Sequence, residues 1–299
     1  MKVAVEAAGG LALRPAWADY LELTKPRLTL MVLAVALAGA WTAAGGPVDA
    51  FRLLHLLTGT ALVVGGANAL NMLLERGLDS RMERTRRRPL PCGRLLPREA
   101  GVFGCLLGAG GVAQLALATT AEAALVASAA FLLYAGVYTP LKRATTLNTH
   151  VGAVPGALPA VIGWAAVRGS VGAEAWLLFG ILYLWQLPHF LSIAWIHRAD
   201  YRRAGFRMLP CADPEGLATA RQAVLGTLAL LPVSLAPAAA RLAGPVYFLA
   251  ALLFGAAYLG FALRFTRCRT PAAARGLMRA SLAYLPLLLL FLLADAGPL

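Results

Sequence analysis

Long apolar stretches without charge constrain the fold of this chain more than any other feature. Nine stretches lack Asp, Glu, Lys and Arg, and about 20 apolar residues suffice to cross a bilayer as a helix. They are Leu28–Val48, Leu53–Leu74, Ala100–Ala121, Ala123–Leu141, Ala144–Val167, Ala175–Ile196, Gln222–Ala240, Leu242–Leu263 and Ala280–Ala294. These runs are continuous, rich in Leu and Ala, and longer than barrel strands. The sequence therefore predicts an all-α integral membrane protein with nine transmembrane helices.

The basic residues predict how these helices are oriented. The net charge is +13, although only 14% of the residues are charged. Such an excess of basic residues is, taken alone, also typical of a nucleic-acid-binding protein. However, 24 of the 27 Lys and Arg residues fall in the N-terminal segment and in the loops after the second, fourth, sixth and eighth stretches. This alternation predicts an inner-membrane protein with a cytoplasmic N-terminus and an external C-terminus, and no nucleic-acid partner. We expect residues 1–27 to form a cytosolic N-terminal segment and residues 28–299 a single membrane domain.

The loop after the second stretch carries the clearest functional pattern. If the helix continues, Asn71, Glu75 and Asp79 stand at i, i+4 and i+8 and share one face. Two carboxylates and an amide oxygen suit Mg²⁺, and the five arginines between Arg81 and Arg88 can bind phosphate oxygens. Together they suggest a diphosphate bound at the membrane face. The same residues also fit a solvated helix end with local ion pairs beside anionic lipid.

Polar residues inside the predicted spans gather on one side of the membrane. Six of them fall in the cytosolic half, and Gln114 is the main exception. They are Asn68, Asn71, Asn148, His150, Gln186 and His189. Because polar groups in lipid are costly and usually face a bundle interior, they predict a polar cavity that opens to the cytoplasm. Its expected rim contains Tyr138, Lys142, Arg198, Asp200, Tyr201, Arg202 and Arg203.

Several motifs make the chain resemble the intramembrane prenyltransferase superfamily, over roughly residues 20 to 290. The resemblance rests on Leu-Thr-Lys-Pro-Arg at 23–27, on the Asn71/Glu75/Asp79 pattern that runs into residues 82–90, on Tyr138-x-x-x-Lys142, on Asn148-Thr149 and on residues 156–164. Two further segments, Trp-Gln-Leu-Pro-His-Phe at 185–190 and residues 200–210, are similar to the heme branch of this superfamily rather than to its quinone branches.

The resemblance implies a fold, a reaction and roles for particular residues. It implies nine helices around a central cavity, and transfer of the farnesyl group of farnesyl diphosphate to the 2-vinyl group of heme B with addition of water. The product would be heme O, made for terminal oxidases. The implied catalytic residues are Asn71, Glu75, Asp79, Tyr138, Lys142 and Asp200, with Glu75, Asp79 and Asp200 as Mg²⁺ ligands. Diphosphate contacts are expected from Arg84, Arg88, Lys142 and Arg202, and heme contacts from His189 and Gln186. Expected partners are farnesyl diphosphate, heme B, membrane lipid, and heme A synthase or terminal oxidase assembly proteins.

The chain departs from the family pattern at both acidic motifs. Glu75 stands where the family commonly has Asp, and Ala204 follows Asp200 at i+4, where a second carboxylate is often found. The second site then has at most one carboxylate from its own segment. Either arginines replace the charge of a second metal, or Asp213 or Glu215 approaches from the loop. Leu187-Pro188 also replaces Pro-Pro before the histidine.

Other functions remain open at this level. The chain could prenylate an aromatic or quinone precursor, transport an anionic lipid or heme, or act as a non-catalytic scaffold in oxidase assembly. His189 could ligate heme iron, bind a propionate, or simply hydrogen-bond Gln186 or a backbone carbonyl.

Overall fold

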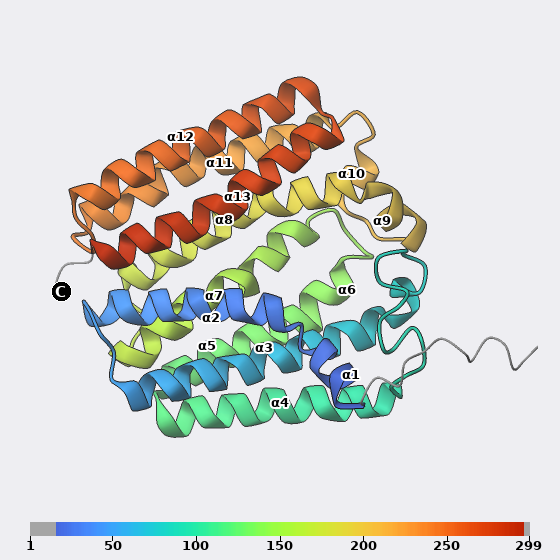
Figure 1. Ribbon diagram of the computed structural model, residues 1–299, viewed down its shortest axis with the longest axis horizontal. Coiled ribbons are helices and arrows are strands. Elements are labelled where there is room, and N and C mark those ends of the chain that lie inside the picture. Colours follow the sequence, from blue (N-terminus) through green and yellow to red (C-terminus); the bar gives the residue numbers. More distant parts are fainter. Residues whose placement is uncertain (1–15, 296–299) are drawn as a thin grey trace, which may run out of the picture.

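A computed structural model describes residues 16–295, which form a bundle of helices without any strand in that range (Figure 1). A short helix, α1 (Ala16–Leu23), precedes the bundle. Nine segments of the described chain are long and apolar enough to cross a membrane. They are α2 (Pro26–Ala44), α3 (Ala50–Asp79), α4 (Pro97–Ala118), Ala121–Leu141, α7 (Asn148–Arg168), α8 (Ala173–Ile196), α11 (Leu217–Ala239), α12 (Pro245–Cys268) and α13 (Pro271–Ala294). The predicted all-α membrane fold is confirmed. Residues 1–15 of the predicted N-terminal segment, and residues 296–299, lie outside the described residues.

Several helices extend well past their charge-free stretches. α3 runs for 30 residues and ends at Asp79, so it carries the predicted acidic face in continuous helix. α13 begins at Pro271, and its first turns include Arg275 and Arg279, which the expected span Ala280–Ala294 left out. Long basic side chains can keep their charged heads at the membrane interface while the helix continues. The absence of charge therefore marks the middle of a span but not its ends.

The fourth span is not a uniform α-helix. It consists of α5 (Ala121–Leu132), a π-helical turn η2 (Leu133–Tyr138) and α6 (Thr139–Leu141). Such turns are rare and occur frequently at functional sites. The Thr139 hydroxyl donates a hydrogen bond to the Tyr134 carbonyl oxygen at 2.8 Å. The same carbonyl oxygen also accepts from the Thr139 backbone N–H, so Thr139 binds it twice within the widened turn.

The central helix of the bundle is α7. In its apolar window 72% of the residues are buried, against 28–50% in the other eight spans. It packs closely on α2, because a Cβ at Gly163 would overlap the Ala36 carbonyl and a Cβ at Gly39 would overlap the Ala160 carbonyl. Small residues of this kind let membrane helices approach each other where no hydrophobic effect drives association.

The segments predicted to carry the site lie at one end of the bundle. The C-terminal end of α3, α6, α9 (Arg198–Ala204) and α10 (Leu209–Ala212) gather there, at the end opposite to the labelled C-terminus (Figure 1). The Arg207 amide donates to the Lys142 carbonyl oxygen at 2.8 Å, and the Asn148 amide group donates to the Arg207 carbonyl oxygen at 2.8 Å. These bonds fix the segment after α9 over the loop that follows α6.

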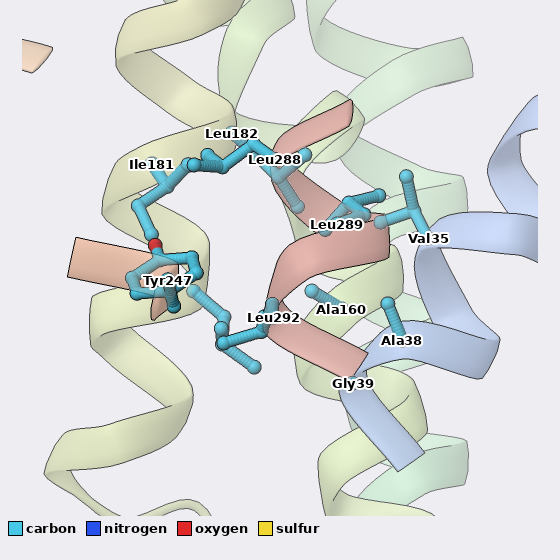
Figure 2. A pocket seen from close by; sticks show the side chains of 11 residues that line it. Val35, Ala38, Gly39, Ala160, Ile181, Leu182, Tyr247, Leu288, Leu289 and Leu292 are labelled. Carbon is cyan, nitrogen blue, oxygen red and sulfur yellow. The ribbon is translucent and has the colours of Figure 1, made fainter. Parts of the chain in front are cut away.

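A small apolar pocket lies between α2, α7, α8, α12 and α13 (Figure 2). Its only hydroxyl belongs to Tyr247, which already donates to the Ser234 carbonyl oxygen at 2.8 Å. The free volume is about 10 Å³, which barely admits one water molecule. This pocket offers neither room nor polar groups for a substrate in the present arrangement.

Candidate active site

A polar cavity of about 240 Å³ lies at the end of the bundle where α3, α6 and α9 meet. Seven of the predicted site residues line it: Asn71, Glu75, Asp79, Arg84, Arg88, Tyr138 and Lys142. Six residues that the sequence analysis had not assigned to a catalytic or binding role complete the lining: Lys25, Met82, Tyr134, Tyr201, Phe206 and Met208. The cavity thus joins the acidic face of α3 to residues that lie far apart in the sequence.

One wall is the acidic face of α3. Asn71, Glu75 and Asp79 point from successive turns into the cavity, and none is more than 6% exposed. The two carboxylates are paired with cations. The Lys142 ammonium lies 2.7 Å from a Glu75 oxygen, and the Arg88 guanidinium lies 2.7 Å from Oδ2 of Asp79. Pairing of this kind is what makes buried charge tolerable.

One carboxylate oxygen remains without a partner. Oδ1 of Asp79 is buried and accepts no hydrogen bond from the residues described. A buried acceptor left in this state costs free energy unless something binds it. The oxygen therefore marks a place where a cation would be stabilised.

The two carboxylates of the cavity, Glu75 and Asp79, suit Mg²⁺ better than a metal ion whose ligands all come from protein side chains. In residues 16–295 no three His, Cys, Asp or Glu side chains gather into a group that could enclose a metal. Mg²⁺ is usually held by one or two carboxylates and completes its shell with water and substrate phosphate oxygens. Glu75 and Asp79 match that requirement.

The opposite wall comes from the π-helical turn. Tyr134 and Tyr138 lie with ring centroids 5.5 Å apart, and the Lys142 ammonium sits 4.5 Å from the Tyr138 ring centroid. Tyr138 packs directly on Gly152 of α7, where a Cβ would overlap the tyrosine ring. Tyr138 and Lys142 were predicted site residues but Tyr134 was not, although it precedes Tyr138 by four residues and this spacing was a usable signal.

Lys25 lines the cavity, although no role was predicted for it beyond its place in the Leu-Thr-Lys-Pro-Arg motif at 23–27. Its ammonium donates to Oδ1 of Asn71 at 2.9 Å, and the Asn71 amide group donates to the Thr139 hydroxyl at 3.1 Å. Burial, together with the nearby charges of Arg88 and Lys142, lowers the pKa of Lys25 to about 7. The pKa of Lys142 is raised: burial alone would lower it, but the neighbouring Tyr138 and Glu75 oxygens outweigh burial.

The predicted second acidic site is arranged differently from the first. Tyr201 lines the cavity, but its neighbours Asp200 and Arg202 do not. Asp200 forms an ion pair with Arg203, and Arg202 donates to the Cys211 carbonyl oxygen at 3.1 Å. The structure therefore does not bring Asp200 or Arg202 into contact with the α3 carboxylates.

The alternative acidic residue for this site already has partners. Oδ2 of Asp213 accepts hydrogen bonds from the Thr219 backbone N–H at 2.7 Å and from the Thr219 hydroxyl at 2.8 Å. This carboxylate thus binds the first turn of α11. The cavity lining contains two carboxylates, both from α3.

The two heme candidates lie on α8, outside the cavity lining. Gln186 is buried, and its amide group donates to the Leu182 carbonyl oxygen at 3.0 Å. His189 stacks on Trp185, with ring centroids 5.2 Å apart, and its Nδ1 lies 2.7 Å from the Ser281 hydroxyl. That hydroxyl donates its hydrogen to the Met278 carbonyl oxygen at 2.6 Å. Ser281 must therefore accept from Nδ1–H, which leaves a lone pair on Nε2 of His189.

The sequence matches one family along most of its length. The profile described as the UbiA prenyltransferase family matches residues 32–291. A protoheme IX farnesyltransferase of Solibacter usitatus is 44% identical over 286 residues, which cover 93% of this chain and 98% of the relative. A second protein of that name, from Azotobacter vinelandii, is 41% identical and covers 94% of both chains.

Solved structures share the fold at low sequence identity. A structure of digeranylgeranylglyceryl phosphate synthase superimposes with a TM-score of 0.80 at 15% identity, covering 94% of this chain and 98% of the other. A UbiA homolog from Archaeoglobus fulgidus bound to GPP and Mg²⁺ gives a TM-score of 0.61 at 15% identity, covering 92% and 99%. The two structures confirm the fold.

Proposed function

Because the chain belongs to the UbiA prenyltransferase family, we propose that its polar cavity binds the diphosphate of farnesyl diphosphate and that the enzyme farnesylates heme B. The acceptor follows from relatives named protoheme IX farnesyltransferase that match nearly the whole chain. The product is heme O. The observation that carries the proposal is the buried, unpartnered Oδ1 of Asp79 in a cavity that also contains four cationic side chains.

The cavity residues supply what diphosphate departure requires. Glu75 and Asp79 would hold Mg²⁺, which when bound would supply positive charge against the negative charge of the leaving diphosphate. Arg84, Arg88 and Lys142 lie where they can hold the remaining phosphate oxygens. With this charge compensated, the bond between the allylic carbon and oxygen breaks, and diphosphate leaves with the bonding electrons.

The aromatic and apolar lining then protects the allylic cation. Tyr134, Tyr138 and Phe206 present rings to the cavity and limit access of water. The terminal vinyl carbon of heme B forms the new carbon–carbon bond, and positive charge passes to the adjacent vinyl carbon. Water adds there and loses a proton, which leaves the hydroxyethylfarnesyl group.

We assign the heme side to His189 and Gln186 on α8. In the stacked Trp185–His189 pair, Nε2 of His189 has no hydrogen-bond partner and carries a lone pair, so it would ligate heme iron. Gln186 is buried against α7 and would act by fixing this part of α8.

Roles for Asp200 and Arg202 stay predictions. Asp200 could ligate a second Mg²⁺ only after it leaves Arg203, and Arg202 could reach diphosphate only after it leaves the Cys211 carbonyl oxygen. Tyr201, between them, already lines the cavity. Both roles would require α9 to rotate when substrate binds, so that Asp200 and Arg202 leave their present partners and face the cavity.

We also propose where the enzyme works and with which neighbours. The distribution of basic residues favours the inner membrane, with the N-terminus and the cavity on the cytoplasmic side and the C-terminus outside. Residues 1–27 would then be a cytosolic segment and residues 28–299 one membrane domain. Heme A synthase and terminal oxidase assembly proteins are the expected protein partners, because they would consume a farnesylated heme.

Heme extraction from cells tests the acceptor. Expression of the chain in a host without this activity should produce extractable heme O, whereas a prenyltransferase for an aromatic or quinone precursor should leave the heme pool unchanged. Glu75→Gln should abolish heme O formation, and Glu83→Gln, an exposed residue of the same loop, should not. Unchanged hemes with a prenylated quinone precursor would overturn the assignment of heme B.

A further inference from the structure

Arginines surround the short connection between α12 and α13, at the end of the bundle opposite to the labelled C-terminus (Figure 1). Only Arg269 and Thr270 separate the two helices. The other arginines lie near the end of α12 and in the first part of α13. We call this group the arginine corner, and its members are Arg264, Arg267, Arg269, Arg275 and Arg279.

Packing and capping fix the shape of the corner. Phe265 is fully buried, and its ring packs edge-on against Trp195 of α8 with ring centroids 5.8 Å apart. The Thr270 hydroxyl accepts from the Ala273 backbone N–H at 3.2 Å and so caps the start of α13. Arg269 ends α12 in a left-handed conformation, with φ of +48°, at a position that glycine usually occupies. An arginine there has a conformational cost that glycine would not have.

The charges of the arginine corner have no partner within residues 16–295. The five side chains take part in no hydrogen bond or ion pair there, and all except Arg269 are exposed. Other arginines at this end of the bundle behave differently, since Arg88 and Arg203 each pair with a carboxylate. The corner is therefore a basic patch without a counter-charge from the protein.

The neighbouring sequence supplies no carboxylate for the corner. Between Glu215 and Asp295 the chain contains neither Asp nor Glu. Glu215 is exposed before α11 and pairs with none of the five arginines. Asp295 lies at the other end of α13, where its carboxylate accepts from the Tyr247 backbone N–H at 2.7 Å. A counter-charge must therefore come from outside the chain.

Four of the arginines form two like-charged pairs. Arg264 and Arg267 are three residues apart on α12, and Arg275 and Arg279 are four residues apart on α13. Residues at these spacings are neighbours on a helix surface, so their like charges repel each other. An anion bound between the guanidinium groups relieves this repulsion and accepts their hydrogen bonds. The arrangement therefore favours an anionic ligand.

Exposed apolar side chains lie one turn further into each helix. Leu263 precedes Arg267 by four residues on α12, and Leu282 follows Arg279 by three on α13, so each leucine shares a helix face with its arginine. Leu263 is 43% exposed and Leu282 is 48% exposed. Charge at the helix ends beside apolar surface matches a phospholipid, which has an anionic headgroup and apolar chains. An inorganic anion would match the charged part alone.

We propose that the arginine corner binds the phosphate group of an anionic phospholipid, whose acyl chains lie against the exposed faces of α12 and α13. Basic residues beside transmembrane helices recognise such headgroups. In the proposed orientation the corner faces the cytoplasmic leaflet, where anionic lipid is available. The site is separate from the polar cavity, because none of its five arginines lines that cavity. The inference does not require the proposed function, since the ligand is a lipid of the membrane rather than a substrate.

Equilibrium titration with a labelled lipid tests the site. The full-length protein, purified in a neutral detergent, is titrated with fluorescent phosphatidylglycerol. Arg275→Gln/Arg279→Gln should raise the apparent Kd by about tenfold to thirtyfold, because two of the positive charges near the headgroup are lost. Arg275→Lys/Arg279→Lys keeps both charges and should stay within about threefold of the wild type. The matched control is Arg98→Gln/Arg143→Gln, which removes two exposed arginines outside the corner and should leave the Kd unchanged.

Competition separates a phospholipid from other ligands. Unlabelled phosphatidylglycerol should displace the labelled lipid, whereas phosphatidylcholine, inorganic phosphate and heme B should not do so at the same concentrations. Displacement by phosphatidylcholine would show that apolar contact alone holds the lipid. Displacement by inorganic phosphate would show an anion site without a lipid component, and displacement by heme B would assign the corner to its propionates. Each of these three results would overturn the proposal.

The variants and the ionic strength give further decisive outcomes. Binding should weaken as salt is raised, because salt screens exposed charges, and a Kd independent of salt would contradict the proposal. Equal Kd values for the wild type and Arg275→Gln/Arg279→Gln, or equal losses in that variant and the control, would overturn it as well. Should the α13 variant not purify as a folded protein, Arg264→Gln/Arg267→Gln removes the pair on α12 and is compared with the same control, with the same outcomes.

Discussion

The Lys142 ammonium lies 2.7 Å from a carboxylate oxygen of Glu75, although 67 positions separate the two residues in the chain. The pair connects the end of α3 to the segment after α6, and both side chains are largely buried. It therefore fixes the distance between the acidic wall of the cavity and the wall that carries Tyr134 and Tyr138.

Removing the charge of Lys142 should cost both stability and activity. Lys142→Met leaves the buried Glu75 carboxylate without its cation, which is strongly destabilising for a buried pair. We expect a lower Tm and a fall of kcat/KM for farnesyl diphosphate by about a hundredfold or more, because a diphosphate contact is also lost. Arg143→Met, at an exposed neighbouring position, should change neither. An unchanged kcat/KM in Lys142→Met would contradict the proposed role.

The two α3 carboxylates should set the response to Mg²⁺. Asp79→Asn keeps the shape of the side chain but weakens its interaction with a hard cation. We expect turnover to fall by about a hundredfold to a thousandfold, and the Mg²⁺ concentration for half-maximal activity to rise. A Mg²⁺ titration of the variant against Glu83→Gln measures both quantities. The assignment is wrong if Asp79→Asn follows the wild-type titration.

Gly152 should be necessary for the position of Tyr138. A methyl group at this position would overlap the tyrosine ring, so Gly152→Ala should move the ring and disturb Lys142, which sits over it. We expect kcat/KM to fall by about tenfold. Gly260→Ala, on α12, meets no atom within 4 Å and serves as the control. Equal activity of the two variants would show that Tyr138 has room to adjust.

His189 should contribute to heme affinity without affecting diphosphate affinity. His189→Ala removes the Nε2 lone pair, and Ser281→Ala removes the hydroxyl that holds Nδ1–H. We expect both variants to bind heme B more weakly, His189→Ala by about tenfold, with an altered Soret band, while the Kd for farnesyl thiodiphosphate stays constant. His197→Ala is the matched control at the end of α8. Wild-type heme titrations for His189→Ala would remove this residue from the heme site.

The sequence predicted the spans and the acidic face because these depend on local pattern. Charge-free runs identify the middle of each helix, and the spacing of Asn71, Glu75 and Asp79 is enough once α3 is known to continue. The sequence could not show which side chains tertiary packing brings together as hydrogen-bond and ion-pair partners. Asp200 is paired with Arg203 on its own helix, and Asp213 binds the start of α11.

The π-helical turn and Lys25 were missed for a related reason. Nothing in residues 133–138 distinguishes a π turn from an α-helix by periodicity, since the turn is maintained by contacts such as the bond from Thr139 to the Tyr134 carbonyl oxygen. Lys25 looked like one of many basic residues near a helix start. Only its backbone conformation and its bond to Asn71 place it in the cavity.

The central claim is that this cavity carries out Mg²⁺-dependent farnesyl transfer to heme B. The most direct measurement incubates the purified protein in detergent with farnesyl diphosphate and heme B, with Mg²⁺ or with EDTA, and analyses the products by mass spectrometry. We predict heme O and free diphosphate with Mg²⁺, and neither product with EDTA. Heme B recovered unchanged in both samples, from protein that is folded and binds heme, would contradict the account and favour a transporter or an assembly scaffold.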